Sequence, residues 1–550
     1  MIDNITTDIK NILYPYVETQ STTGTSLEVK AENFLMNYFQ NINYFKGNPK
    51  FFGAYKIDND PLERSVCYAM IKGEGEDTVV FIHHYDVVDT EDFRLLRPFA
   101  YSPKELSFQL FKIKETLNEE SKTDLESGEF LFGRGAADMK GGGSIQLALL
   151  KKYSEMQNLK GNVLLIAVPD EENLSAGMRG AVKFLDELKN QYNLNYLLMI
   201  NSEPHQRKNK EIGVLSEGSV GKLMPFIYVR GYLAHIGKVF EGFNPTNLLC
   251  EIVRRTELNL ELSDSVNNET SPPPTWLYLK DNKQHYDVSM PLSASGCFSI
   301  LTLKKSPGEM LEKVRDICNE AFDTIIHQMN QSYSKFKYGM GEEVDTLPWK
   351  PQVITFKNLY YEALCKYGEE FEKHYDYKLK ELIVNLNSGK ISMLQSSFSL
   401  IDTIYDYIDD LSPRVVIGLT PPYYPSVSNM FFNDLSQKAS NLSEELSNHA
   451  RETFEQEYST ELFFTGISDL SYTSIQNGSN VIKTLEESMP LYGYYYEIPI
   501  DCIERVSMPC INIGPWGKDF HKLTERVYKE DLFNRTPKLI HHAVSYMLGW

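Results

Sequence analysis

Short apolar segments alternate with helical patterns between residues 65 and 202, and this alternation limits the fold more than any other feature of the chain. Four segments are typical of buried strands: SVCYAMI (65–71), TVVFIHH (78–84), NVLLIAV (162–168) and YLLMINS (196–202). Two stretches between them carry apolar residues at spacings of three and four, as helices do: residues 144–156 and 176–192. Alternating strands and helices predict an α/β domain with a mostly parallel central sheet flanked by helices. In such sheets, ligands bind at the carboxyl ends of the strands.

A second region begins near residue 214, where the pattern becomes strand, helix, strand and helix. This order predicts a small α+β insert over residues 214–355. The chain then becomes helical and returns to strand patterns at PRVVIGL (413–419) and PCINIGP (509–515). We therefore expect one catalytic domain made of residues 1–213 and 356–550, interrupted by the insert. The strongly polar stretch 113–129 is interpreted as an exposed loop or hairpin.

Charge and cysteine content exclude several classes of protein. The formal net charge of −20 argues against binding to nucleic-acid phosphates or to anionic lipid, both of which need a basic face. Seven cysteines without a CxxC pair do not suggest a disulfide framework. The N-terminus lacks a basic region followed by an apolar stretch, and no apolar run reaches the roughly 18 residues of a transmembrane helix. We expect a cytoplasmic protein that binds neither nucleic acid nor membrane.

Acidic and imidazole side chains follow the predicted strands in five segments. In FIHHYDVVD, His84 and Asp86 stand two residues apart, so they face the same side of an extended chain. A metal-binding histidine needs a group that holds its second ring nitrogen, and Asp86 is a candidate for that group. Taken alone, a buried histidine beside a surface aspartate is the simpler interpretation of the pair.

The next two segments are rich in glycine and acid. Asp138 lies in GRGAADMKGGG, where it is positioned to bridge two cations or simply to cap a helix. The pattern is GxGxxD and does not match the dinucleotide fingerprint. Asp170, Glu171 and Glu172 follow the strand NVLLIAV, and three adjacent acids repel one another unless cations or solvent relieve them. For these three acids alone, a solvated acidic loop is the simpler interpretation.

Two single residues complete the set. Glu203 follows the strand YLLMI, and His521 lies far downstream in FHKLTERV. Carboxylates combined with imidazoles suit zinc, manganese or cobalt. The motifs HExxH and GxSxG are absent, and EGSVGKL lacks the spacing of a phosphate-binding loop.

Together these segments resemble a known family. The order HxD, GRGxxDMKGG, DEE, EP and a late histidine is similar to that of the aminoacylase, carboxypeptidase G and succinyl-diaminopimelate desuccinylase family of dinuclear metallopeptidases. The resemblance covers nearly the whole chain. Its length and the segment NIGPWGKDFHKLTERV resemble the arginine-utilisation branch of that family. The resemblance implies a role in amino-acid metabolism and identifies the insert as a lid domain.

The resemblance also implies a set of metal ligands. His84, Asp138 and Glu203 would hold one cation, whereas Asp138, Glu172 and His521 would hold the other, with Asp138 as the bridge. Zn²⁺ is the expected metal, with Mn²⁺ and Co²⁺ as alternatives.

Other positions receive roles from the same resemblance. Glu171 would be the general base and Asp86 would orient the first histidine ligand. In the lid segment VRGYLAHIGKVFEGFNP, His235 would stabilise the oxyanion, often from a partner subunit. Asp469, at the end of TGISD, would support the site by holding its ligands without binding the metals itself. Asn244 and Arg414 are the candidate substrate-binding residues. The lid arginine and asparagine of the family have no clear counterparts, MPLSASGCFSILT contains no arginine, and Arg414 is either a substitute or a surface residue.

The expected function is metal-dependent cleavage of an amide bond in a small peptide or an N-acylated amino acid. Pairing of the lid domain would make the protein a homodimer. The alternative is a catalytically inactive family member that acts as a binding or scaffold protein. Inactive members usually lose a ligand or the base, whereas here all these positions are filled.

Overall fold

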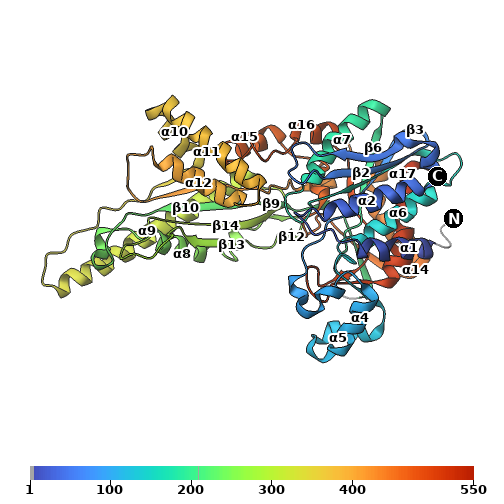
Figure 1. The fold of residues 1–550 in the computed structure, drawn as a ribbon, viewed down its shortest axis with the longest axis horizontal. Helices are drawn as coiled ribbons and strands as arrows, with labels where there is room; N and C mark the ends of the chain where they lie inside the picture. Colours follow the sequence, from blue (N-terminus) through green and yellow to red (C-terminus); the bar gives the residue numbers. More distant parts are fainter. Residues whose placement is uncertain (1–4, 208–209) are drawn as a thin grey trace. The chain divides into compact units, whose positions relative to one another are not determined.

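The computed structural model describes residues 5–207 and 210–550. Its contacts divide the chain into two compact units (Figure 1). Unit 1 comprises Met1–Val220, Pro425–Gln476 and Pro499–Trp550. Unit 2 comprises Gly221–Tyr424 and Asn477–Ile498. Each unit has a β-sheet of its own.

Unit 1 is built on an eight-stranded sheet, and its four central strands are parallel. In sheet order the strands are β1 (Phe52–Lys56), β2 (Ser65–Lys72), β5 (Lys160–Val168), β3 (Glu74–His84), β6 (Asn195–Asn201), β19 (Cys510–Asn512), β7 (Ile212–Ser216) and β18 (Glu457–Glu461). Strands β1 and β2 are antiparallel to their neighbours, and β7 is antiparallel to β19. The middle of β3 is fully buried from Val79 to Ile82, as expected for a strand covered on both faces. The predicted α/β fold is confirmed.

Helices pack on this sheet as the periodicity predicts. Helix α6 (Lys140–Ser154) and helix α17 (Thr536–Leu548) contact β3, and α7 (Ala176–Tyr192) contacts β2 and β5. Two glycines at the start of α6 permit its close approach. A Cβ at Gly142 would lie 2.1 Å from the Ser202 carbonyl oxygen, and one at Gly143 would lie 2.6 Å from the His83 ring. Because these glycines have no side chains, the start of α6 can pack closely against the ends of β3 and β6.

The polar stretch 113–129 folds as a helix, which corrects the predicted loop or hairpin. A short 3₁₀ turn, Lys114–Thr116, is followed by α5 (Glu119–Ser127). Asn118 caps α5 by accepting a hydrogen bond from the Ser121 amide at 2.8 Å. The helix buries an acid, Asp124, which pairs with the Arg526 guanidinium at 2.7 Å. Because ion pairs rather than an apolar stripe hold α5, hydrophobic periodicity did not reveal it.

Unit 2 is an α+β arrangement around a six-stranded sheet. Its strands are β13 (Thr275–Asp281), β14 (Ser293–Thr302), β10 (Pro225–Arg230), β16 (Arg414–Leu419) and β15 (Val353–Thr355), with β9 (Gly221–Leu223) pairing with β14. Helices α8 (Pro245–Thr256) and α9 (Pro307–Gly339) contact each other and the sheet. A capping box in which Ser306 and Glu309 bond reciprocally begins α9.

Three further helices enlarge unit 2. They are α10 (Phe356–Tyr367), α11 (Glu369–Asn387) and α12 (Met393–Tyr405). Phe398 of α12 packs against Phe226 and Tyr228, which alternate along β10 and so share one face of the sheet. These helices form one buried apolar cluster with that face.

The division into units therefore differs from the predicted boundary at residue 355. Strand β16, predicted as part of the catalytic domain, pairs antiparallel with β10 in unit 2. Helix α15 (Gly478–Ser488) also belongs to unit 2 and contacts α9. Strand β16 is buried along its whole length in unit 2, and an apolar strand of this kind suits the core of either sheet, so its sequence does not identify its neighbour.

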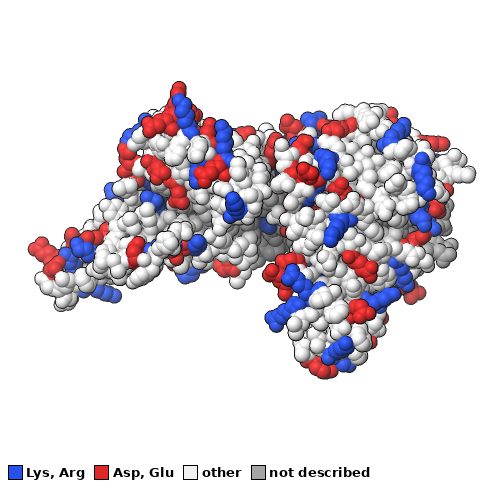
Figure 2. All heavy atoms as spheres, viewed as in Figure 1, with Lys and Arg blue, Asp and Glu red and all other residues white. Residues whose placement is uncertain are grey.

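Two surface properties accompany this fold. None of the helices in the described ranges 5–207 and 210–550 is both long and apolar enough to span a membrane. On the face shown in Figure 2, acidic and basic side chains are interspersed over both units.

Candidate metal centre

Three of the five predicted ligands lie at the carboxyl ends of neighbouring strands, and the other two come from loops outside that sheet. His84 ends β3, and Glu203 lies two residues after the end of β6. Glu172 follows β5, and Asp138 lies two residues before α6. His521 belongs to the connection between β20 (Gly517–Lys518) and β21 (Arg526–Tyr528). Strands β5, β3 and β6 are parallel neighbours, so the loops that follow them meet at one edge.

The structure brings these side chains together around Asp138. Oδ1 of Asp138 lies 3.1 Å from Nε2 of His84, and Oδ2 lies 3.3 Å from Nε2 of His521. Glu203 places Oε1 3.3 Å from the His84 nitrogen. Glu172 places Oε1 3.0 Å from the His521 nitrogen. One carboxylate thus faces two imidazoles, and each imidazole has a second carboxylate of its own.

The donor set fits divalent cations. One ligand atom each from His84, Asp138 and Glu172 lies within 4.8 Å of the other two, a spacing that suits metal ligation. Imidazole nitrogens and carboxylate oxygens suit Zn²⁺ and related metals. Asp469, at the start of the turn Asp469–Tyr472, is buried, and neither of its carboxylate oxygens has a hydrogen-bond partner within the described part of the chain. Buried carboxylates without partners indicate that positive charge is needed nearby.

The electrostatics agree with this interpretation. Burial opposes the charge of His84, yet Glu203 and Asp138 raise its pKa well above the usual range. Hydrogen bonds to Asp138 and Glu172 raise the pKa of His521 to about 11. Burial, with repulsion from Asp138, raises the pKa of Glu203 to about 8 and also raises that of Glu172. The carboxylates therefore crowd one another, and cations would relieve this repulsion.

Asp86 acts on its surroundings through two different groups. Its backbone carbonyl oxygen lies 3.0 Å from Nδ1 of His84, which directs Nε2 toward the carboxylates. Its side-chain Oδ1 accepts the amide of Glu171 at 3.1 Å, and Oδ2 accepts the amide of Glu172 at 3.3 Å. The hydroxyl of Thr23 donates to Oδ2 at 2.8 Å. The main chain of Asp86 thus orients the histidine, whereas its carboxylate holds the acidic loop.

One buried ion pair next to the site was not identified from the sequence. Glu525 pairs with Arg134 at 2.6 Å, and both side chains are 1% exposed. Oε1 of Glu525 accepts the amides of Ala137 and Asp138 at 3.3 and 3.4 Å. The pair therefore anchors the backbone that carries Asp138. Both residues lie within the matched motifs, but nothing in their spacing indicates that they meet.

Glu525→Gln should destabilise unit 1. Removing Glu525 from the buried pair leaves the Arg134 guanidinium with the partly exposed Asp92, at 2.9 Å, as its remaining carboxylate partner, and the loss costs about 3 kcal/mol. Urea unfolding followed by circular dichroism measures this loss. The double variant Arg134→Met/Glu525→Gln should lose less than the two single variants together. Strictly additive losses would show that the pair contributes no coupling energy.

Three predicted residues lie in unit 2. His235 is exposed, and its Nδ1 accepts the Gly237 amide at 3.1 Å. Asn244 caps α8 by accepting the Thr246 amide at 3.0 Å. Arg414 is 5% exposed, and its guanidinium binds Glu362 at 2.7 Å and Asp410 at 2.6 Å. The roles assigned to these three residues stay predictions, and the two carboxylates already engage the charge of Arg414.

Comparison with known proteins identifies related chains. A family model described as peptidase family M20/M25/M40 matches residues 110–548. The uncharacterized protein YqjN of Bacillus subtilis is 30% identical over 541 residues, covering 98% of this chain and 96% of that protein. Protein RocB of the same organism is 29% identical over 537 residues, covering 97% and 93%. The structure of human carnosine dipeptidase 1 aligns with a TM-score of 0.53 at 12% identity, covering 100% of this chain and 98% of that one, which shows a shared fold.

Proposed function

Because the chain belongs to peptidase family M20/M25/M40, we propose that it is a metal-dependent hydrolase that cleaves an amide bond in a small peptide or an N-acylated amino acid. The family expected from the motifs is confirmed. The observation that carries the proposal is the position of Asp138, which directs one carboxylate oxygen toward each of two imidazoles. A scaffold function would not require this arrangement, and the Glu171 carboxylate, close enough to His84 for their charges to interact, would be the base.

We propose two divalent cations as the cofactors. His84, Asp138 and Glu203 would hold one, and Asp138, Glu172 and His521 would hold the other. Zn²⁺ is the proposed metal, because its preferred ligands are this mixture of imidazole and carboxylate, and Mn²⁺ or Co²⁺ would accept the same set.

The side chains divide the proposed chemistry among them. Two divalent cations, when bound, would lower the pKa of a water molecule and polarise the carbonyl of the substrate. The Glu171 carboxylate would take a proton from the attacking water and then pass it to the leaving amine. Burial and the neighbouring acids Asp469, Glu172 and Glu203 raise the pKa of Glu171 well above its usual range, and bound cations would lower it again so that the carboxylate can accept a proton. His235 would donate a hydrogen bond to the developing oxyanion.

Metal content per chain, measured by plasma mass spectrometry, tests the proposal. Protein purified without chelator should hold two transition-metal ions per chain. Removal of the metal with a chelator should abolish hydrolysis of dipeptides and N-acyl amino acids. It should also lower the thermal midpoint, because ions that bind only the folded chain stabilise it. Added Zn²⁺, Mn²⁺ or Co²⁺ should restore both properties.

The control is the same chelator treatment followed by addition of Mg²⁺, which prefers oxygen ligands and should restore little. A chain that holds no metal, and that gains neither activity nor thermal stability from added Zn²⁺, Mn²⁺ or Co²⁺, would contradict the proposed hydrolase.

We also propose that two copies associate through unit 2 in the cytoplasm. Strand β13 lies at an edge of its sheet, and it exposes Leu277 by 55% and Leu279 by 50%. An apolar edge strand offers unpaired backbone groups to a second copy. Sedimentation velocity would measure the association, and a monomer at all concentrations would contradict it.

All seven cysteines are free thiols, which supports the proposed location in a reducing compartment. Cell fractionation would test this location.

A further inference from the structure

Three consecutive backbone amides of the acidic loop donate to buried carboxylates. The amide of Asp170 donates to Oε2 of Glu28 at 3.0 Å. The amides of Glu171 and Glu172 donate to the two oxygens of Asp86 at 3.1 and 3.3 Å. Glu28 and Asp86, which lie outside the loop, therefore hold its backbone by hydrogen bonds. The loop carries both the proposed base and a proposed metal ligand. Its position depends on whatever holds those acids.

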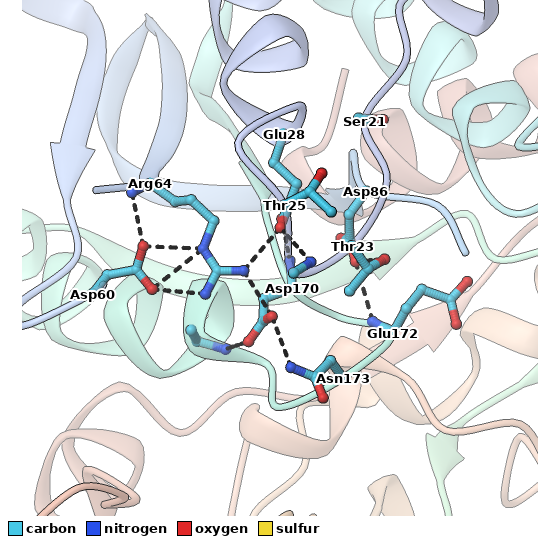
Figure 3. Close-up of polar contacts among 12 residues, drawn as sticks. Ser21, Thr23, Thr25, Glu28, Asp60, Arg64, Asp86, Asp170, Glu172 and Asn173 are labelled. Atoms are coloured by element: carbon cyan, nitrogen blue, oxygen red, sulfur yellow. Dashed lines mark hydrogen bonds and ion pairs between the residues drawn. The ribbon is translucent and has the colours of Figure 1, made fainter. Parts of the chain in front are cut away.

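Arg64 links one of these acids to the loop itself. Its Nη1 lies 2.9 Å from Oε1 of Glu28 and 2.7 Å from Oδ1 of Asp170 (Figure 3). Asp60 holds the opposite side of the guanidinium, with contacts of 2.7 Å to Nη2 and 3.0 Å to Nε. The side chain of Arg64 is 5% exposed, and those of Glu28 and Asp170 are 0% and 1% exposed. One buried guanidinium therefore bridges α2 (Glu28–Asn41) and the loop after β5.

The loop conformation itself needs this support. Asp170 has a left-handed backbone with φ of 66°, which a residue other than glycine adopts only at a cost. Its Oδ2 accepts the amide of Ala176 at 3.1 Å, at the start of α7, and its Oδ1 faces the guanidinium. Without Arg64, the buried carboxylates of Glu28 and Asp170 would repel each other without compensation. The loop would relax away from Glu28 to let water reach both acids.

We propose that Arg64 is a positioning residue, which through Glu28 and Asp170 fixes the loop that aims Glu171 and Glu172 at the metal centre. This inference rests on the proposed hydrolase for its catalytic consequence, but its structural consequence is independent of any activity. Arg64 does not touch the ligands. A loop displacement of about 1 Å at a reacting group lowers turnover by about 100-fold, so the effect on catalysis is large.

Residue-resolved hydrogen–deuterium exchange tests the structural step. Arg64→Met removes the charge and every donor, whereas Arg64→Lys keeps the charge but offers no planar fork. The matched control is Arg255→Met in unit 2, which removes a guanidinium that binds Glu251 at 2.8 Å and Glu320 at 2.9 Å. Exchange of the amides of residues 170–172 should accelerate at least about tenfold in Arg64→Met, because local opening exposes them. In Arg255→Met these amides should exchange as in the wild type.

Steady-state kinetics distinguish a positioning role of Arg64 from a purely stabilising one. With a substrate that the wild type hydrolyses, Arg64→Met should lower kcat by about 100-fold with little change in KM, and Arg64→Lys should recover part of the loss. Wild-type exchange at residues 170–172 together with wild-type kcat in Arg64→Met would overturn the inference. If Arg64→Met does not fold, Arg64→Lys decides the question alone by both measurements. A wild type that hydrolyses no substrate would refute the proposed function, while the exchange result would still decide whether Arg64 holds the loop.

Discussion

Glu171→Gln should lower kcat by about 10²- to 10⁴-fold while the protein keeps its full metal content. The substitution preserves the shape of the side chain but removes its capacity to accept a proton. The backbone amide that donates to Asp86 is unchanged, so the loop should stay in place. Because Glu171 acts in the proposed transition state and not in ground-state binding, KM should change little. Steady-state kinetics with metal analysis of the same preparation provides the measurement.

The control for this variant is Glu187→Gln, in which an exposed acid bonded to the Tyr55 hydroxyl at 2.8 Å is replaced by the same amide. It should turn over like the wild type. If Glu171→Gln also kept a turnover rate close to that of the wild type, the assignment of the base would be wrong. If it instead lost metal, Glu171 would belong to the ligand set.

Asp138→Ala should have the largest effect on metal binding. This carboxylate stands within 3.1 and 3.3 Å of two imidazole nitrogens, so its removal deletes a ligand from both proposed ions at once. His84 and His521 would also lose the carboxylate that they share. We expect less than one metal ion per chain and a loss of activity of more than about 10⁴-fold, the upper range for one catalytic feature. Titration with Zn²⁺ followed by calorimetry measures the binding.

A matched variant separates this effect from a general loss of carboxylate–imidazole contacts. Glu445 bonds to Nε2 of His542 at 3.0 Å, outside the group of proposed ligands. Glu445→Ala should retain both metal ions and activity. Two tightly bound ions in Asp138→Ala would contradict the bridging role and would require a different ligand arrangement.

Several features of this protein could be predicted from the sequence because they depend on local patterns. The strands around His84, Asp170 and Glu203 are short apolar runs, and each polar side chain follows its run directly. Parallel strands then place such residues at one edge whatever the details of packing. The assignment of ligands to two metal positions came from the resemblance to a family and not from spacing.

Other features depend on contacts between distant segments, which leave no local pattern. Helix α5 lacks an apolar stripe, and it is held by pairs such as Asp124 with Arg526, about four hundred residues away by sequence. Strand β16 joins unit 2 because it pairs with β10, although its apolar sequence would suit either sheet.

The site shows the same division. The types of the proposed ligands and their order along the chain were determined by the sequence alone. Only the tertiary structure decided that Glu525 and Arg134 anchor the Asp138 backbone, and that Arg64 joins Glu28 to Asp170. A buried charge is stable only beside its partners, and partners that meet through folding can lie anywhere in the chain. Residues that touch a ligand can therefore be recognised from local motifs, whereas residues that hold them in place are revealed by three-dimensional contacts.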